Sequence, residues 1–83
     1  MSEPHAIRLK RLKIRSWRRG IKEMDMILGR FFDTNGESLA EEHLDAYERL
    51  LEENDQDLYA WVSGQADMPG EHVDIIQRIQ NFS

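Results

Sequence analysis

The sequence contains no cysteine and is poor in proline and aromatic residues, with two prolines and 8% aromatics in 83 residues. Without cysteine there is no disulfide framework, no thiolate metal site and no iron–sulfur cluster. No apolar run approaches the ~20 residues that a membrane-spanning helix needs. The first residues have neither an apolar signal core nor a long Arg/Ser-rich transit segment. We therefore expect a small cytoplasmic protein without direct membrane insertion.

The residue patterns that support catalysis are also missing. His5, His43 and His72 have no His-x-x-x-His or Glu-x-x-His spacing of the kind that builds a metal site. No serine has a nearby histidine to activate it, and the five glycines are too scattered to form a phosphate-binding loop. We expect a binding protein that is not an enzyme, with no metal and no stably bound cofactor. His43 is expected to be a half-buried, hydrogen-bonded residue.

Charge is distributed unevenly along the chain, whose net charge is −5. Residues 1–30 contain nine of the eleven lysines and arginines and carry about +6, whereas residues 31–83 carry about −11. A basic helix that packs across acidic helices would explain this division, and so would a basic segment that faces an anionic partner. The sequence alone leaves both explanations open.

Hydrophobic periodicity predicts an all-α fold, a compact single-domain bundle of about five short helices within residues 1–83. The first two helices are predicted over residues 5–19 and 21–32. Gly20 between them is expected to adopt the left-handed conformation that commonly ends a helix. The apolar face of the second helix comprises Ile21, Met24, Ile27, Leu28, Phe31 and Phe32.

A turn is predicted at residues 33–36, and a capping box that starts at Ser38 opens a third helix running to about residue 54. The predicted core side of this helix comprises Leu39, Leu44, Tyr47, Leu50 and Leu51. Its other side is strongly acidic, and we interpret that side as a solvated face. The acidic residues are Glu41, Glu42, Asp45, Glu48, Glu52 and Glu53.

Two shorter helices complete the predicted bundle. Asp55 or Asp57 is expected to cap a fourth helix, which Gly64 ends. Pro69 suits the first position of the last helix. The apolar positions are Leu58, Trp61 and Val62 in the fourth helix and Val73, Ile76, Ile79 and Phe82 in the last.

The first helix carries a stripe of arginines. Arg8, Arg11, Arg15, Arg18 and Arg19 fall within an arc of about 100°, with Ile7, Ile14 and Trp17 on another side. One candidate function is therefore a small nucleic-acid-binding or regulatory protein, in which the arginines track phosphates and Trp17 stacks on a base. The acidic remainder of the chain would repel the same polyanion, and no turn-plus-recognition-helix pattern is present.

The residues around the bend favour a protein–protein docking surface instead. Arginine, tryptophan and methionine are enriched as interface anchors. Five such residues gather around the bend: Arg15, Trp17, Arg18, Arg19 and Met26. Met26 points away from the core face of the second helix, where a flexible side chain offers an adaptable contact.

The same bend resembles a known family. Residues 19–23 read Arg-Gly-Ile-Lys-Glu, which matches the Arg-Gly-x-x-Glu signature of the SdhE family, the small flavinylation and assembly factors of succinate dehydrogenase. Residues 15–25, the Tyr-Glu-Arg-Leu-Leu-Glu run at 47–52 and the Leu-Tyr-Ala-Trp-Val run at 58–62 also resemble this family, in order and with matching spacings.

This resemblance implies a five-helix bundle that binds the flavoprotein subunit of succinate dehydrogenase, or of fumarate reductase in some bacteria. It would promote covalent attachment of FAD to a histidine of that client, so FAD would be the client's cofactor. Arg19, Gly20 and Glu23 would lie at the client contact. Gly20 would allow a tight bend, Arg19 would donate to a client carboxylate or carbonyl, and Glu23 would accept from a client donor or brace Arg19. The free chain is expected to be a monomer.

Overall fold

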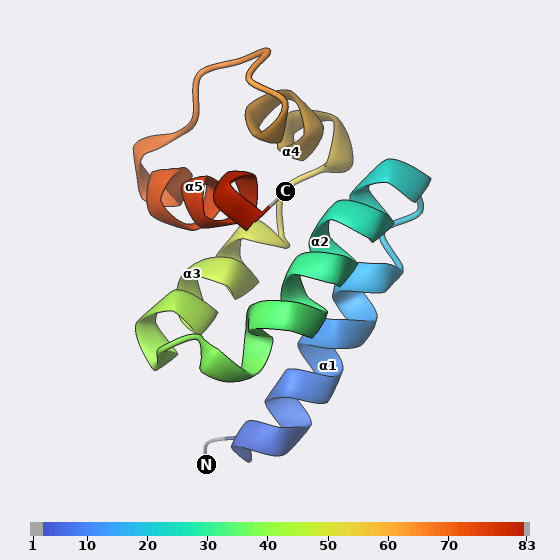
Figure 1. The fold of residues 1–83 in the computed structure, drawn as a ribbon, viewed down its shortest axis with the longest axis vertical. Helices are drawn as coiled ribbons and strands as arrows, with labels where there is room; N and C mark the ends of the chain where they lie inside the picture. Colours follow the sequence, from blue (N-terminus) through green and yellow to red (C-terminus); the bar gives the residue numbers. More distant parts are fainter. Residues whose placement is uncertain (1–2, 83) are drawn as a thin grey trace.

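The computed structural model describes residues 3–82, which form five α-helices and two short 3-10 helices and contain no strand (Figure 1). The α-helices are α1 (His5–Trp17), α2 (Lys22–Asn35), α3 (Glu41–Leu50), α4 (Asp55–Val62) and α5 (Val73–Phe82). The 3-10 helices are η1 (Gly36–Ser38) and η2 (Gly70–His72). The predicted all-α class and the five-helix bundle are confirmed.

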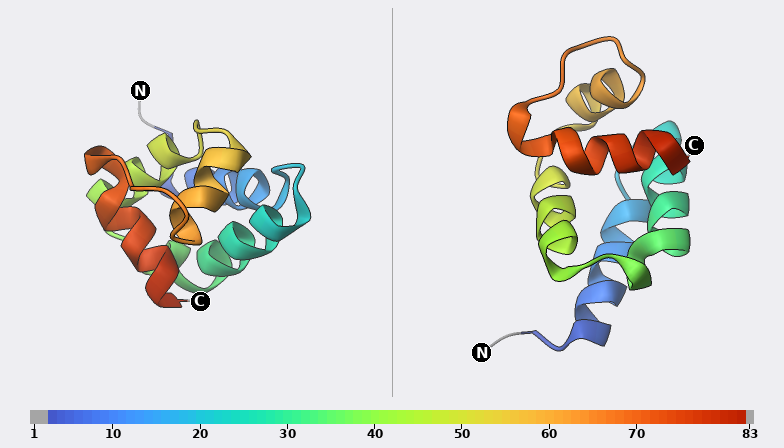
Figure 2. Two further views of the ribbon diagram at one scale, coloured as in Figure 1. Left: turned by 90° about the horizontal axis from the view of Figure 1, so that it is seen from above. Right: turned by 60° about the vertical axis from the view of Figure 1, so that its left-hand side comes forward.

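The first two helices pack side by side and run in opposite directions (Figure 1). α5 lies across the ends of α2 and α3 and contacts both of them, as the right-hand view of Figure 2 shows. α4 packs against α5 and α2. This arrangement brings the α1–α2 loop and the α3–α4 loop to the same end of the molecule, although they are more than thirty residues apart in the sequence.

The core takes apolar side chains from all five α-helices. It consists of Leu12, Met24, Leu28, Phe31, Phe32, Leu39, Leu44, Tyr47, Leu50, Leu51, Leu58, Ile75, Ile76 and Ile79. The predicted core sides of the second and third helices are therefore confirmed in their main positions. In α5 the burial is carried by Ile75, Ile76 and Ile79, whereas Phe82 at the helix end is 37% exposed.

Tyr47 lies at the centre of this core and links three helices. Its ring packs on Phe31 and Phe32 of α2, with centroid distances of 5.8 and 5.1 Å. Its hydroxyl lies 2.6 Å from the Ser16 Oγ of α1 and 3.3 Å from the Leu28 carbonyl of α2. Burial raises the pKa of the Tyr47 hydroxyl well above its usual range. The hydroxyl is thus a neutral, hydrogen-bonded group that sets the registration of α1, α2 and α3.

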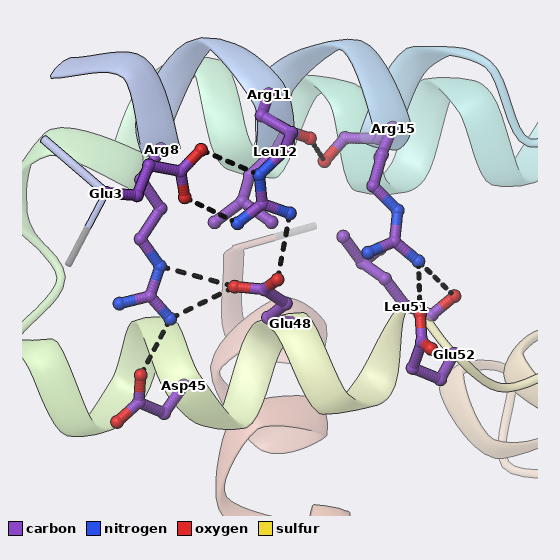
Figure 3. Close-up of polar contacts among 10 residues, drawn as sticks. Glu3, Arg8, Arg11, Leu12, Arg15, Asp45, Glu48, Leu51 and Glu52 are labelled. Atoms are coloured by element: carbon purple, nitrogen blue, oxygen red, sulfur yellow. Dashed lines mark hydrogen bonds and ion pairs between the residues drawn. The ribbon is translucent and has the colours of Figure 1, made fainter. Parts of the chain in front are cut away.

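A second set of contacts between α1 and α3 is ionic (Figure 3). The Arg8 guanidinium donates to Asp45 at 2.7 Å and to Glu48 at 3.3 Å, and Arg11 pairs with Glu48 at 2.8 Å. Arg15 continues the row with Glu52 at 2.5 Å. Hydrogen bonding from Arg11, with a smaller contribution from Arg8, holds the pKa of the Glu48 carboxyl below its ordinary value.

These pairs support the first explanation of the charge asymmetry for the arginines of α1, because the basic helix does pack across an acidic one. The acidic side of the third helix is therefore not simply a solvated face, as we had interpreted it: Glu41, Asp45, Glu48 and Glu52 all pair with arginines of α1. With these arginines neutralised inside the fold, nothing in the structure supports the nucleic-acid alternative.

Two predicted helix ends, those of α1 and α2, are wrong. α1 ends at Trp17, two residues before the predicted end. α2 continues through residues 33–35, where a turn was predicted, and the Gly36 N–H still donates to the Phe32 carbonyl. At Gly36, where η1 begins, the Phe32 ring lies so close that an added Cβ would approach it to 2.8 Å.

The predicted capping residues of the later helices also differ from the structure. α3 begins at Glu41, after Ala40, and has no capping box. The hydroxyl of Ser38, in η1, instead donates to the carbonyl of Asn35 at the end of α2. α3 ends at Leu50, and Asn54, not Asp55 or Asp57, caps α4 by accepting from the Asp57 N–H.

Gly64, with φ of +82°, follows the end of α4 as predicted. At the start of the last helix, Pro69 precedes η2, so α5 begins only at Val73.

No helix within residues 3–82 has both the length and the apolar character required to cross a bilayer.

Replacing Glu48 by glutamine tests the ionic contacts between α1 and α3. The lowered native pKa means that, on acidification, the unfolded chain takes up this proton before the folded chain does. The variant should be less stable than the wild type by about 1 kcal/mol at pH 7. This difference should shrink as the pH falls below the ordinary value of 4.5.

Denaturant titrations at several pH values measure the difference. Glu42→Gln is the control, since Glu42 is exposed and unpaired among the described residues. A difference that stays constant down to pH 3 would contradict the role of the ionised carboxylate.

Candidate docking surface at the first interhelical loop

The loop between α1 and α2 consists of four residues, 18–21, and depends on Gly20. Its φ of +100° lies in the left-handed region that L side chains rarely adopt. Gly20 is exposed, and an added Cβ would meet no atom within 4 Å. Glycine is therefore required here for the backbone conformation and not for lack of space. The predicted left-handed glycine is confirmed, although it lies three residues beyond the helix end.

Arg19 fixes this loop to the opposite side of the molecule. Its guanidinium donates to Asp55 Oδ1 at 2.8 Å and to the carbonyls of Leu51 and Glu53, each at 2.6 Å. Leu51 and Glu53 lie just after α3, where helical carbonyls are left without partners and attract cations. The Arg19 side chain is only 11% exposed and Asp55 only 13%. Each nitrogen of the guanidinium group thus donates a hydrogen bond within the chain.

Asp25 fixes the same loop to α2. Its carboxylate Oδ1 accepts a hydrogen bond of 2.6 Å from the backbone N–H of Arg19. A carboxylate in the first turn of a helix also interacts favourably with the helix dipole. Arg19 is therefore held twice, through its side chain to the α3–α4 loop and through its backbone to α2.

The outer side of the loop and of α2 is exposed and has unused polar groups. Arg18, Lys22 and Glu23 are exposed and have no polar side-chain partner within the described residues. Met26, one turn after Glu23, is 41% exposed. A shallow hollow adjoins Met26 on the same face of α2, and it is lined by Met26, Ile27, Arg30 and Phe82. We call Arg18, Gly20, Lys22, Glu23 and Met26 the loop surface.

Comparison with known proteins agrees with the signature at this loop. A family profile described as flavinator of succinate dehydrogenase matches residues 10–83. The FAD assembly factor SdhE of Legionella pneumophila (strain Lens) is 38% identical over 64 residues, which cover 77% of this chain and 81% of that protein. This chain belongs to the SdhE family.

Other relatives come from bacteria and from mitochondria. The FAD assembly factor SdhE of Acetobacter pasteurianus is 36% identical over 66 residues, which cover 80% of this chain and 61% of that protein. The mitochondrial succinate dehydrogenase assembly factor 2 of Meyerozyma guilliermondii is 41% identical over 58 residues, 70% of this chain. The matched part is only 43% of the mitochondrial protein.

Within this SdhE-family fold, the predicted site residues separate into two groups. Gly20, Glu23, Arg18 and Met26 lie together on the loop surface. Arg19, Arg15 and Trp17 are used inside the chain. Arg15 pairs with Glu52. The Trp17 indole donates to Asp33 at 3.2 Å, and its ring lies so close to Gly29 that an added Cβ would come within 2.3 Å of it. The side chains of these three residues are bound to other parts of the chain and are not free groups of the loop surface.

Two acidic residues that hold the site were not identified as such from the sequence. The local sequence does not assign Asp25 to the site, and it predicts Asp55 only as a candidate helix cap. Asp55 meets Arg19 across a separation of 36 residues, so no local spacing could indicate the pair. The alternative in which Glu23 braces Arg19 is wrong, because Asp55 occupies that position and the Glu23 carboxylate stays free.

The histidines also differ in part from expectation. His43 is half-buried and lies 3.3 Å from Arg78 Nη2, which confirms the expected hydrogen bond. His72 is not isolated, as local spacing suggested, since its Nε2 lies 2.8 Å from Glu53 Oε2 and 3.3 Å from Glu71 Oε1. Metal-bound histidines usually donate their second ring N–H to an acceptor. Within residues 3–82, Nδ1 of His72 is buried without a hydrogen-bond partner, and the contact of Nε2 with Glu53 attaches η2 to the α3–α4 loop.

Replacing Arg19 by lysine tests the attachment of the loop. An ammonium group cannot donate to three acceptors in the geometry of a guanidinium fork. We expect the free energy of unfolding to fall by about 2–3 kcal/mol, because buried carbonyls and Asp55 lose their donor.

Arg18→Lys is the matched control, since Arg18 is exposed and unpaired in the region described. Its stability should change by less than about 0.5 kcal/mol. Equal stabilities of the two variants in urea titrations would contradict the structural role of Arg19.

Proposed function

We propose that this protein is an assembly factor that binds the flavoprotein subunit of succinate dehydrogenase and promotes the covalent attachment of FAD to it. The observation that carries the proposal is the family match over residues 10–83. The relatives named as FAD assembly factors support it, as does a preformed, exposed loop at the family signature. The proposal extends to the fumarate reductase flavoprotein as a second client.

The proposed role is non-catalytic. The chemistry of attachment belongs to the client and its flavin, and FAD is the client's cofactor. A helper protein can accelerate such a reaction by binding the competent conformation of its client more tightly than other conformations. A preference of ~2–3 kcal/mol shifts the population of that conformation roughly 30- to 150-fold. This mechanism needs a rigid, complementary surface and no reactive side chain, and a small cytoplasmic helical domain suits it.

The loop surface has the properties that this role requires. Gly20 has no side chain and lets a client backbone approach closely. The Glu23 carboxylate is exposed and free to accept hydrogen bonds from a client donor. Arg18 and Met26 extend the contact, while Arg19, Arg15 and Trp17 keep the loop in place through their internal contacts. Because Arg19 is attached both through its side chain and through its backbone, little conformational entropy of the loop is lost on docking.

Co-purification with the flavoprotein subunit, followed by in-gel flavin fluorescence with and without this protein, tests the proposal. We expect a stable complex and stronger fluorescence of the subunit when this protein is present. Equal fluorescence in both lanes would contradict the proposed function.

Glu23→Gln tests the role of the free carboxylate. We expect the affinity for the flavoprotein to fall by about tenfold, the effect of losing a charge-assisted hydrogen bond. Thermal stability should not change, because Glu23 has no internal partner in residues 3–82. Glu42→Gln is the control of equal charge change on an exposed part of α3. A marked fall in the melting temperature of Glu23→Gln would instead assign this residue to the fold.

Gly20→Arg tests the need for a bare backbone in the loop. Gly20 is exposed, and an added Cβ there would meet no described atom within 4 Å, so the helical content measured by circular dichroism should be retained. The positive φ costs about 1 kcal/mol for a non-glycine residue, and the added side chain should abolish client binding. A variant that binds the flavoprotein normally would show that the loop is not the contact.

A further inference from the structure

A second exposed surface runs along the outer side of α1. Ile7 and Ile14 are each 55% exposed, more than any other large apolar residue described. They are seven residues apart, so they lie on the same side of the helix. Lys10 lies between them, and Arg18 follows at the helix end. We call Ile7, Lys10, Ile14 and Arg18 the outer stripe.

Charge pairing distinguishes this stripe from the rest of α1. Arg8, Arg11, Lys13 and Arg15 each have an acidic partner, and so has Arg19 in the following loop. Lys10 and Arg18 are exposed and have no acidic partner among residues 3–82. Within the described residues, the two unpaired cations of this segment, Lys10 and Arg18, are thus near the exposed isoleucines in the sequence. The chain carries a net charge of −5, so this local positive charge is not a consequence of overall composition.

We propose that the outer stripe is a second docking surface, which takes an apolar depression bordered by carboxylates on a protein partner. On the proposed function, that partner is the flavoprotein client. Two isoleucines occupy an apolar depression, and Lys10 and Arg18 meet the carboxylates at its border. Arg18 directly follows α1 and precedes Arg19 and Gly20 in the loop, so it is common to the two surfaces, and one partner can contact both.

Other classes of partner fit the stripe less well. Two isoleucines about 10 Å apart along a helix are too small an apolar area to hold a helix on a bilayer surface. Two unpaired cations neutralise too few phosphates for stable nucleic-acid binding, particularly on an acidic protein. A protein surface needs only a few anchoring side chains around which other contacts exclude water.

The test compares Ile7→Ser/Ile14→Ser with the wild type in binding to purified apo-flavoprotein. We expect the dissociation constant to rise by about tenfold or more. Tyr59→Ser is the matched control, because Tyr59 is an exposed apolar residue of α4, outside the stripe, at 39% exposure. Its affinity should stay within about twofold of the wild type. The single variant Ile14→Lys replaces the double variant should the latter not fold.

A charge-reversal variant provides a second readout. Lys10→Glu/Arg18→Glu should slow association with the flavoprotein at low salt and weaken the salt dependence of the association rate. An association rate equal to that of the wild type would contradict the electrostatic part of the proposal.

The outcomes separate this inference from the proposed function. If Gly20→Arg loses binding while the isoleucine double variant binds like the wild type, the outer stripe is not a docking surface and the proposed function stands. If the wild type itself does not bind the flavoprotein, the proposed function fails, and the assignment of the stripe fails with it. Two further results would overturn the proposed partner. One is flotation of the wild type, but not of the double variant, with phosphatidylglycerol vesicles. The other is a dimer that light scattering detects for the wild type but not for the double variant.

Discussion

The geometry of the loop surface depends on one arginine side chain. Arg19 joins two loops that are distant in the sequence by donating to Asp55 and to the carbonyls of Leu51 and Glu53. Carbonyls at a helix end have no partner within the helix, and a guanidinium group satisfies two of them and a carboxylate at once. The arginine of the family signature is therefore used within the fold of the free protein, whereas its neighbours Gly20 and Glu23 are exposed.

The packing of α1 shows how a small domain can remain ordered with a limited core. A chain of this length buries a modest apolar area, and α1 contributes one fully buried apolar residue, Leu12. Leu9 also packs against the core, and the Trp17 ring lies on Gly29 of α2. The polar attachments are the Ser16–Tyr47 hydrogen bond and the row of arginine–carboxylate pairs. Exposed ion pairs contribute little individually. Here they share residues across two helices and fix the orientation of α1, which leaves its outer isoleucines facing solvent.

In the signature region some side chains are exposed, and others are bound inside the chain. Exposed groups without partners, such as Glu23 and Lys22, can exchange water for a client contact at little cost to the fold. Groups with several internal partners, such as Arg19 and Trp17, would have to give up those contacts first. For the same reason, the outer stripe is distinguished by the absence of partners and not by residue type, since arginines elsewhere on α1 are neutralised by α3.

The sequence by itself determined the helical class, the core sides of α2 and α3, the left-handed Gly20 and the family, because these follow from local periodicity, backbone preference and an ordered motif. It did not determine the ends of α1 and α3, the residue that caps α4, or the partners of Arg19, His72 and the arginine row. The Asn54 cap is a local contact three residues long, but Asp55 and Asp57 are capping residues of equal preference in the sequence. The partners of Arg19 and the α3-side partners of the arginine row lie more than thirty residues away, and Glu53 lies 19 residues from His72, so only the tertiary structure brings these side chains within hydrogen-bonding distance. The same contacts decided which charged residues remain available to a partner.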